Sequence, residues 1–77
     1  MHVNLNNSEY TLSPRETEIL GLISFEYTTV EIAEKLYLST DTIKSHRKNL
    51  FKKLKARNVA GLIRRAFEHN LIQLEAS

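Results

Sequence analysis

Two helix start signals constrain the fold of this chain more than any other feature of its sequence. Ser13 and Thr28 each stand three residues before a glutamate, Glu16 and Glu31. In such a capping box the hydroxyl accepts a hydrogen bond from the N–H of the glutamate, whose carboxylate accepts one from the N–H of the cap residue. Pro14 also suits the first helical position after Ser13. The sequence therefore predicts a helix that begins at each of these two points.

Apolar residues recur at helical spacing after these signals and after two further caps, Ser39 and Asn58. The helix that starts at Ser39 is expected to run to about Leu54 or Lys55, with Asp41 in its first turn. No stretch alternates strictly enough to indicate a strand, so we predict an all-α fold, a small four-helix bundle. The apolar positions of its helices are Ile19, Leu20, Leu22, Ile23, Ile32, Ala33, Leu36, Ile43, Leu50, Leu54, Val59, Leu62, Ile63, Ala66, Phe67 and Leu71.

Length and composition limit the chain to one small domain. Its 77 residues, 42% of them hydrophobic, suffice for a compact core but not for a sizeable internal pocket. Cysteine is absent, which excludes disulfides and thiolate metal sites. No apolar run approaches the ~20 residues of a membrane span, and no signal peptide is visible, so we expect a cytoplasmic domain with no membrane association. Residues 1–11 are expected to form a flexible N-terminal arm, and residues 12–77 the domain.

Positive charge is concentrated in one of the predicted helices. Residues 41–57 hold seven of the eleven Lys and Arg residues and a single acid, whereas residues 1–40 carry two basic and six acidic groups. At the helical repeat, three of its apolar residues share one side and four of its lysines lie nearly opposite. This opposed placement is typical of a helix whose apolar side packs on a core and whose lysines are presented to nucleic acid. The alternative is that the lysines only form a solvated face. The opposed sets are Ile43, Leu50 and Leu54 against Lys44, Lys48, Lys52 and Lys55.

Only Tyr37-Leu38-Ser39 joins the second predicted helix to this basic helix. So short a connection forces a sharp turn, and a short helix, a tight turn and a longer basic helix make a helix-turn-helix. In that motif the second helix enters the major groove of DNA with its N-terminal end first.

Six blocks of the sequence resemble the LuxR/GerE-type DNA-binding domain of bacterial transcription regulators, in order and at matching spacing over residues 12–72. The resemblance implies a four-helix bundle with a helix-turn-helix, double-stranded DNA as ligand and control of transcription as role. Family members often carry a sensor or receiver domain ahead of this one, so the chain is expected to be either a stand-alone regulator or an excised domain. The blocks are Leu12-Ser13-Pro14-Arg15-Glu16, Glu31-Ile32-Ala33, Leu38-Ser39, Thr42-Ile43-Lys44-Ser45-His46, Lys53-Leu54 and Arg57-Asn58.

The sequence departs from the family pattern at three positions where glycine is lost or gained. Glu26 and Lys55 stand where the family usually has glycine, and Gly61 replaces an acidic residue early in the fourth helix. A glycine that ends a helix commonly supplies a left-handed residue. Either Lys55 adopts that conformation, or the third helix ends differently.

The candidate DNA-binding residues lie mainly in the first half of the basic helix. Lys44 and Lys48 match family positions that reach bases or phosphates, and lysine can donate to guanine or pair with phosphate. Ser45 lies between them and is expected to touch a base edge or a phosphate. Arg47 is expected either to pair with Glu16 or Glu18 or to contact phosphate.

Hydroxyls at helix starts are candidate phosphate contacts. Thr40 and Thr42 lie in the first turn of the basic helix, where free backbone N–H groups favour an anion, and local capping is the alternative. Thr28 and Thr29, at the start of the second helix, invite the same interpretation more weakly. The later lysines, Lys52, Lys53 and Lys55, are expected to add only a diffuse field or solubility.

No residue pattern indicates catalysis, a metal site or a cofactor, so we expect no enzyme activity. His46 is expected to be a semi-buried, hydrogen-bonded histidine, because neither His2 nor His69 stands at ligand spacing to it. Ser45 beside His46 makes no nucleophile pair without an orienting third group, and no phosphate-binding glycine loop is present. The aromatic residues are expected to be core or core-edge groups, namely Phe25, Tyr27, Tyr37 and Phe51.

The fourth helix carries a wide apolar set for a helix that covers one side of a bundle. Family resemblance implies a homodimer through this helix, especially on DNA, with Ile63 and Phe67 in the interface; purely internal packing is the alternative. Contact with RNA polymerase is a further expectation. Two other functions remain open at this point: a small helical protein-interaction module whose basic helix meets an acidic protein, and a sigma-factor-like reader of a promoter element.

Overall fold

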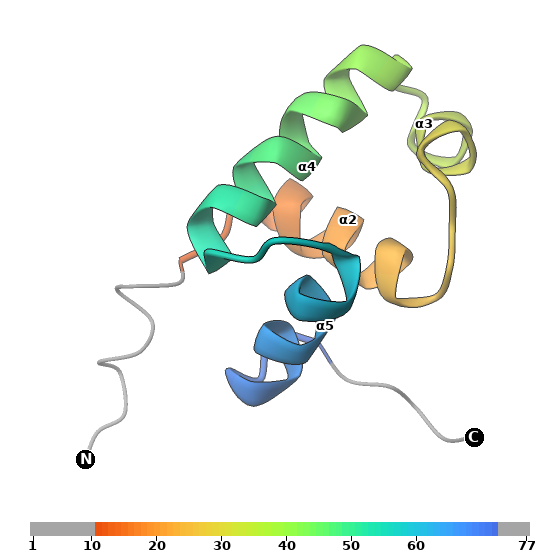
Figure 1. The fold of residues 1–77 in the computed structure, drawn as a ribbon. Helices are drawn as coiled ribbons and strands as arrows, with labels where there is room; N and C mark the ends of the chain where they lie inside the picture. Colours follow the sequence, from red (N-terminus) through yellow and green to blue (C-terminus); the bar gives the residue numbers. More distant parts are fainter. Residues whose placement is uncertain (1–10, 73–77) are drawn as a thin grey trace.

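The computed structural model describes residues 11–72 of the chain, and this part consists of four helices (Figure 1). They are α2 (Pro14–Ser24), α3 (Thr29–Leu36), α4 (Thr40–Leu54) and α5 (Val59–Glu68), and no strand occurs among the described residues. The predicted all-α fold with a helix-turn-helix is confirmed, with α3 and α4 as its two helices. Apart from Thr11, the predicted arm lies outside the described residues. No helix within residues 11–72 is long and apolar enough to cross a membrane.

All four helices begin where the sequence signals predict. Both capping boxes form completely: Ser13 Oγ accepts from the Glu16 N–H at 3.1 Å, and Thr28 Oγ1 accepts from the Glu31 N–H at 3.2 Å. The two glutamates each accept a hydrogen bond back from the N–H of the cap residue. The remaining caps are side-chain oxygens of Ser39, at the start of α4, and Asn58, at the start of α5. Each cap satisfies an N–H that the helix itself leaves without a partner.

Three connections between helices turn on left-handed residues that are not glycine. Glu26, Tyr37 and Lys55 have φ angles of 71°, 58° and 55°. Glu26 and Lys55 are the positions where the resemblance leads one to expect glycine, so the turn geometry is kept although the residue type has changed. Lys55 therefore adopts the left-handed conformation, and α4 ends at Leu54. Each such residue costs about 1–2 kcal/mol relative to an ordinary helical conformation.

Helix α4 is the centre of the bundle. It packs against α2, α3 and α5, whereas these three helices contact one another only slightly. Its predicted apolar residues, Ile43, Leu50 and Leu54, are completely buried. The sequence did not predict Ile72, which is buried beyond the end of α5. The other buried hydrophobic residues of the core are Ile19, Leu20, Ile23, Ile32, Ala33, Leu62 and Ala66.

The prediction that the aromatic residues belong to the core is wrong for three of the four. Tyr37 is 93% exposed and Phe25 is 54% exposed. Both stand at helix C-caps, where the chain leaves the face that packs on the core. Tyr27 is also exposed, and the Lys35 ammonium lies 5.7 Å from the centre of its ring. Only Phe51 is half-buried and packs against the core, as predicted.

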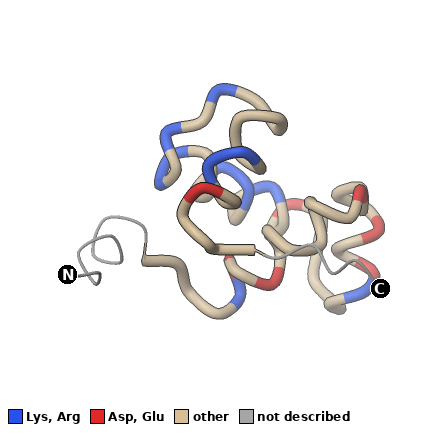
Figure 2. The backbone as a smooth tube through the Cα atoms, turned by 90° about the horizontal axis from the view of Figure 1, so that it is seen from below, with Lys and Arg blue, Asp and Glu red and all other residues tan. Residues whose placement is uncertain are grey.

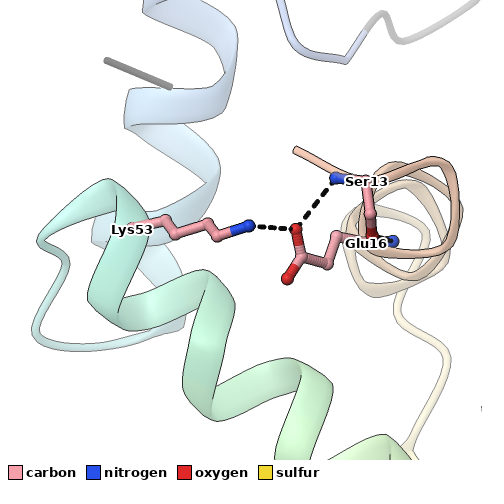
Figure 3. Close-up of polar contacts among 3 residues, drawn as sticks. All are labelled: Ser13, Glu16 and Lys53. Atoms are coloured by element: carbon pink, nitrogen blue, oxygen red, sulfur yellow. Dashed lines mark hydrogen bonds and ion pairs between the residues drawn. The ribbon is translucent and has the colours of Figure 1, made fainter. Parts of the chain in front are cut away.

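A buried carboxylate joins the beginning of α2 to the second half of α4 (Figure 3). The Glu16 side chain is only 6% exposed, and its Oε1 accepts from the Ser13 N–H at 2.9 Å and from the Lys53 Nζ at 2.7 Å. Burial raises the pKa of this carboxyl, but the hydrogen bonds from Lys53 and Ser13 outweigh burial and lower the pKa from its ordinary value of 4.5. The expectation that Lys53 adds only a diffuse field or solubility is therefore wrong.

Replacing Lys53 with methionine should destabilise the domain, because the buried carboxylate of Glu16 would lose its countercharge while the aliphatic stem at position 53 is kept. We expect the free energy of unfolding to fall by about 1–2 kcal/mol, less than for a fully buried pair because the ammonium is partly exposed. Urea denaturation measures the loss. Lys52→Met is the matched control, since Lys52 is exposed and forms no ion pair within residues 11–72, and an equal loss in both variants would contradict the assignment.

The effect of Lys53→Met should also depend on pH. A carboxyl whose pKa is lowered by folding contributes its stabilisation fully above the ordinary pKa, and loses it as the pH falls through the folded-state pKa. The stability difference between the natural chain and the variant should thus be largest near neutral pH and shrink as the pH falls below 4.5. A difference that persists unchanged into strong acid would show that Lys53 stabilises the fold by some other means.

Candidate nucleic-acid interface

The exposed side of α4 is a face of unpaired lysines. Lys44, Lys48, Lys52 and Lys55 are all exposed, on the side of the helix opposite its buried apolar residues. Among the described residues none of the four forms an ion pair. Figure 2 shows most of the Lys and Arg segments in the upper half of the view and most of the Asp and Glu segments below or to the right. The charge separation seen in the sequence is therefore a separation in space.

Several acidic side chains of the domain are engaged at helix starts or in ion pairs away from these lysines. Glu31 closes the capping box of α3, and Asp41 lies in the first turn of α4, where it meets the positive end of the helix dipole. Glu18 pairs with Arg15 at 3.2 Å, and Glu16 pairs with Lys53. Because these carboxylates are engaged elsewhere, the positive potential of the lysine face is not cancelled by local ion pairs.

The N-terminal end of α4 combines an exposed surface with a tight local cap. Ser39 Oγ accepts from the Thr42 N–H at 3.1 Å, and the hydroxyls of Ser39 and Thr42 lie 2.9 Å apart. Local capping therefore accounts for one contact of Thr42, which is half-buried like Thr40. The first N–H groups of a helix have no intrahelical partner, so this end still presents backbone donors to an anion.

Helix α3 packs against α4 (Figure 1), and it begins at Thr29, directly after its cap residue Thr28. Thr28 is exposed, and its hydroxyl is engaged in the capping box. Thr29 is half-buried in the first turn. The structure thus brings the four predicted threonines to the N-terminal ends of the two helices of the helix-turn-helix, although capping already uses the hydroxyl of Thr28 and that of Thr42.

The remaining predicted residues of α4 differ in exposure. Ser45 is exposed and lies between Lys44 and Lys48 along the helix. Arg47 is half-buried and forms no ion pair within residues 11–72, so of its two predicted alternatives the pairing with an α2 glutamate is not formed. Those two glutamates pair with Arg15 and Lys53 instead.

The histidine expectation holds only in part. His46 is half-buried, as predicted, but its side chain forms no hydrogen bond with any other described residue. Within the described part of the chain, no three His, Asp or Glu side chains are grouped so as to hold a metal ion.

On α5, the two residues predicted at a dimer interface are placed differently. Ile63 is half-buried and packs against the core, whereas Phe67 is 40% exposed. Val59 is also exposed on this helix, and Arg64 pairs with Glu68 at 3.1 Å. An apolar side chain thus remains accessible on α5 beside its polar groups, away from the lysine face of α4.

These features define a helix-turn-helix domain with a basic second helix, and the comparisons place it in a family. Residues 10–66 match the family described as bacterial regulatory proteins, luxR family. The match covers well over half of the chain, so the chain belongs to this family of DNA-binding transcription regulators.

Known regulators are similar to this chain over the same region. The transcriptional regulatory protein MctR of Rhizobium johnstonii is 49% identical over 61 residues, which make up 79% of this chain and 28% of MctR. The response regulator protein VraR of Staphylococcus aureus is 40% identical over 62 residues, or 80% of this chain and 30% of VraR, and VraR of Staphylococcus saprophyticus matches equally. The chain thus spans less than a third of the length of these relatives.

Binding to DNA should weaken steeply with salt, because the lysine face neutralises phosphates and releases their counterions. With roughly 4–6 phosphate contacts, the plot of log affinity against log salt concentration should have a slope of about −4 to −5. Fluorescence anisotropy with a labelled duplex across a salt series measures this slope. A slope near zero would contradict the view that phosphate neutralisation by α4 drives binding.

Proposed function

We propose that this domain recognises a specific sequence of double-stranded DNA by placing α4 in the major groove, and that binding there regulates transcription. The observation that carries the proposal is the lysine face of α4. Its lysines have no carboxylate partner within the described residues, while the opposite side of the same helix is buried in the core. A core holds the helix rigidly, so its exposed side chains are presented in one fixed register to the DNA.

The proposed contacts divide into readers and positioners. Lys44, Ser45 and Lys48 lie in the first half of α4 and are proposed to reach base edges, where lysine donates to guanine. Arg47 is proposed to contact phosphate, because it forms no ion pair with the glutamates of α2. The threonines at the starts of α3 and α4 are proposed phosphate contacts through hydroxyls and backbone N–H groups, namely Thr28, Thr29, Thr40 and Thr42.

Replacing a reader should change specificity, whereas replacing a positioner should not. We expect Lys44→Ala and Lys48→Ala each to weaken binding to the best site by roughly 1–3 kcal/mol, with a smaller effect on random duplex. Lys52→Ala, on the same face but further along α4, should weaken both duplexes slightly and equally. The best site is first obtained by selection from a random DNA pool, and anisotropy then gives both affinities. Equal, sequence-independent losses in all three variants would contradict the assigned recognition face.

The role of the domain within its protein is proposed on the same basis. Residues 12–77 are proposed to act as the DNA-binding domain. Contact with RNA polymerase is the proposed route by which the bound domain changes transcription. Support comes from the luxR-family match at residues 10–66 and from the regulator names of the relatives.

A homodimer through α5 is proposed as the form that occupies a full operator. Phe67 is 40% exposed, and a large apolar side chain at that exposure gains from burial against a second copy. A two-fold symmetric dimer reads a palindromic site with its half-sites about one helical turn (~10 base pairs) apart.

Phe67→Glu should abolish cooperative filling of a palindromic site while leaving half-site binding intact, because it places a charge in the proposed interface and leaves α4 unchanged. Gel-shift titrations on half-site and full-site duplexes measure the two properties, with circular dichroism to show that the domain is folded. Phe25→Glu is the matched control, since it adds the same charge at an exposed aromatic residue outside α5. Unchanged cooperativity in Phe67→Glu would show that the dimer does not use this helix.

A further inference from the structure

Tyr37 combines two unfavourable features at the turn of the helix-turn-helix. Its backbone is left-handed, with φ 58° and ψ 43°, and its side chain is 93% exposed. A left-handed residue with a β-carbon is strained, whereas glycine adopts this conformation freely and is the usual residue at such a cap. An aromatic ring that stays exposed to water also contributes no hydrophobic stabilisation to the fold. Glycine at this position would therefore make the free domain more stable.

The fold does not need the side chain of Tyr37 to form the turn. The Tyr37 N–H donates to the Glu34 carbonyl at 3.3 Å, and the Leu38 N–H donates to the Ala33 carbonyl at 2.9 Å. Leu38 is half-buried and packs against the core, which anchors the segment. These contacts fix the backbone on both sides of the ring. The phenol therefore projects into solvent from a rigid base, and within residues 11–72 its hydroxyl has no hydrogen-bond partner.

The position of Tyr37 next to α4 indicates what the ring meets. It lies two residues before Ser39, the cap of α4, and α4 enters the groove with this end first. A residue in the turn before an inserted helix lies at the rim of the groove, where the sugar–phosphate backbone runs. Tyrosine is among the side chains that donate hydrogen bonds to phosphate oxygens, which receive half or more of all protein–DNA hydrogen bonds.

We propose that Tyr37 is an additional DNA contact, whose hydroxyl donates a hydrogen bond to a backbone phosphate at the rim of the groove that receives α4. This inference rests on the proposed placement of α4 in the major groove. Because a phosphate carries no sequence information, Tyr37 acts as a positioning group that sets the register of α4 and strengthens binding to any duplex. The cost of the strained backbone in the free domain is then offset by the hydrogen bond that Tyr37 forms on DNA.

Two variants of the full 77-residue chain separate this role from a structural one. Tyr37→Gly removes the strain, so the midpoint of thermal unfolding should rise, yet affinity for the best site and for random duplex should both fall about three- to tenfold. Tyr37→Phe keeps the ring and the turn and should leave thermal stability unchanged, with a similar loss of affinity because only the donor is removed. Anisotropy and thermal denaturation followed by circular dichroism supply the readouts.

Lys48→Ala is measured in the same assay so that two kinds of failure can be told apart. Full affinity in Tyr37→Phe would overturn the proposed hydrogen bond. Tighter or equal binding by a stabilised Tyr37→Gly would overturn any contact of Tyr37 with DNA. If Lys48→Ala then still weakens the best site, the placement of α4 stands and only the Tyr37 contact fails. If neither position affects binding, both the contact and the placement of α4 fail.

Discussion

The ion pair between Glu16 and Lys53 connects two parts of this domain that lie far apart in the sequence. The residues are 37 positions apart, and one carboxylate oxygen closes the cap of α2 while it accepts a hydrogen bond from the second half of α4. A buried carboxylate without a partner would be strongly unfavourable, so the pair holds α4 at one position along α2. Since α4 is also the helix against which α2, α3 and α5 pack, its position determines that of the whole bundle.

The two faces of α4 have different tasks, and the charge pattern keeps them apart. The buried face supplies Ile43, Leu50 and Leu54 to the core, and hydrophobic burial there stabilises the fold. Lys53 of the same helix forms the ion pair with Glu16. The four lysines of the exposed face form no ion pair within residues 11–72, and they leave a positive surface on this side of the helix.

Local rules explain why so much of the fold was predictable from the sequence. A capping box involves four consecutive residues, so the starts of α2 and α3 follow from SPRE and TTVE without knowledge of the rest. The buried stripe of α4 follows from helical periodicity alone. Contacts between helices were harder to predict from the sequence. Lys53 resembles the other lysines of α4 until the fold places the buried Glu16 beside it. For the same reason the sequence left the partner of Arg47 open between a glutamate of α2 and a phosphate.

Residues at helix ends escaped prediction for another reason. Hydrophobicity indicated burial for Phe25 and Tyr37, but both stand at C-caps, where the chain turns away from the core. The left-handed conformation of Tyr37 depends on how the turn closes, and the residue type does not indicate it. For Lys55 this conformation was one of the two alternatives that the family resemblance left open. In the candidate site, the exposure of Lys44, Ser45 and Lys48 was predictable because exposure on α4 is set by its helical period, whereas their contact with DNA stays a prediction.

Placement of α4 in the major groove is tested most directly by nuclear magnetic resonance on the ¹⁵N-labelled domain, titrated with a half-site duplex taken from the selected sequence. If the groove receives α4, amide shifts should concentrate in residues 37–48 and at residues 28–29, and those of α5 should stay unchanged. Shifts centred on α5 or on the turn between α2 and α3, with residues 40–48 unaffected, would contradict the account.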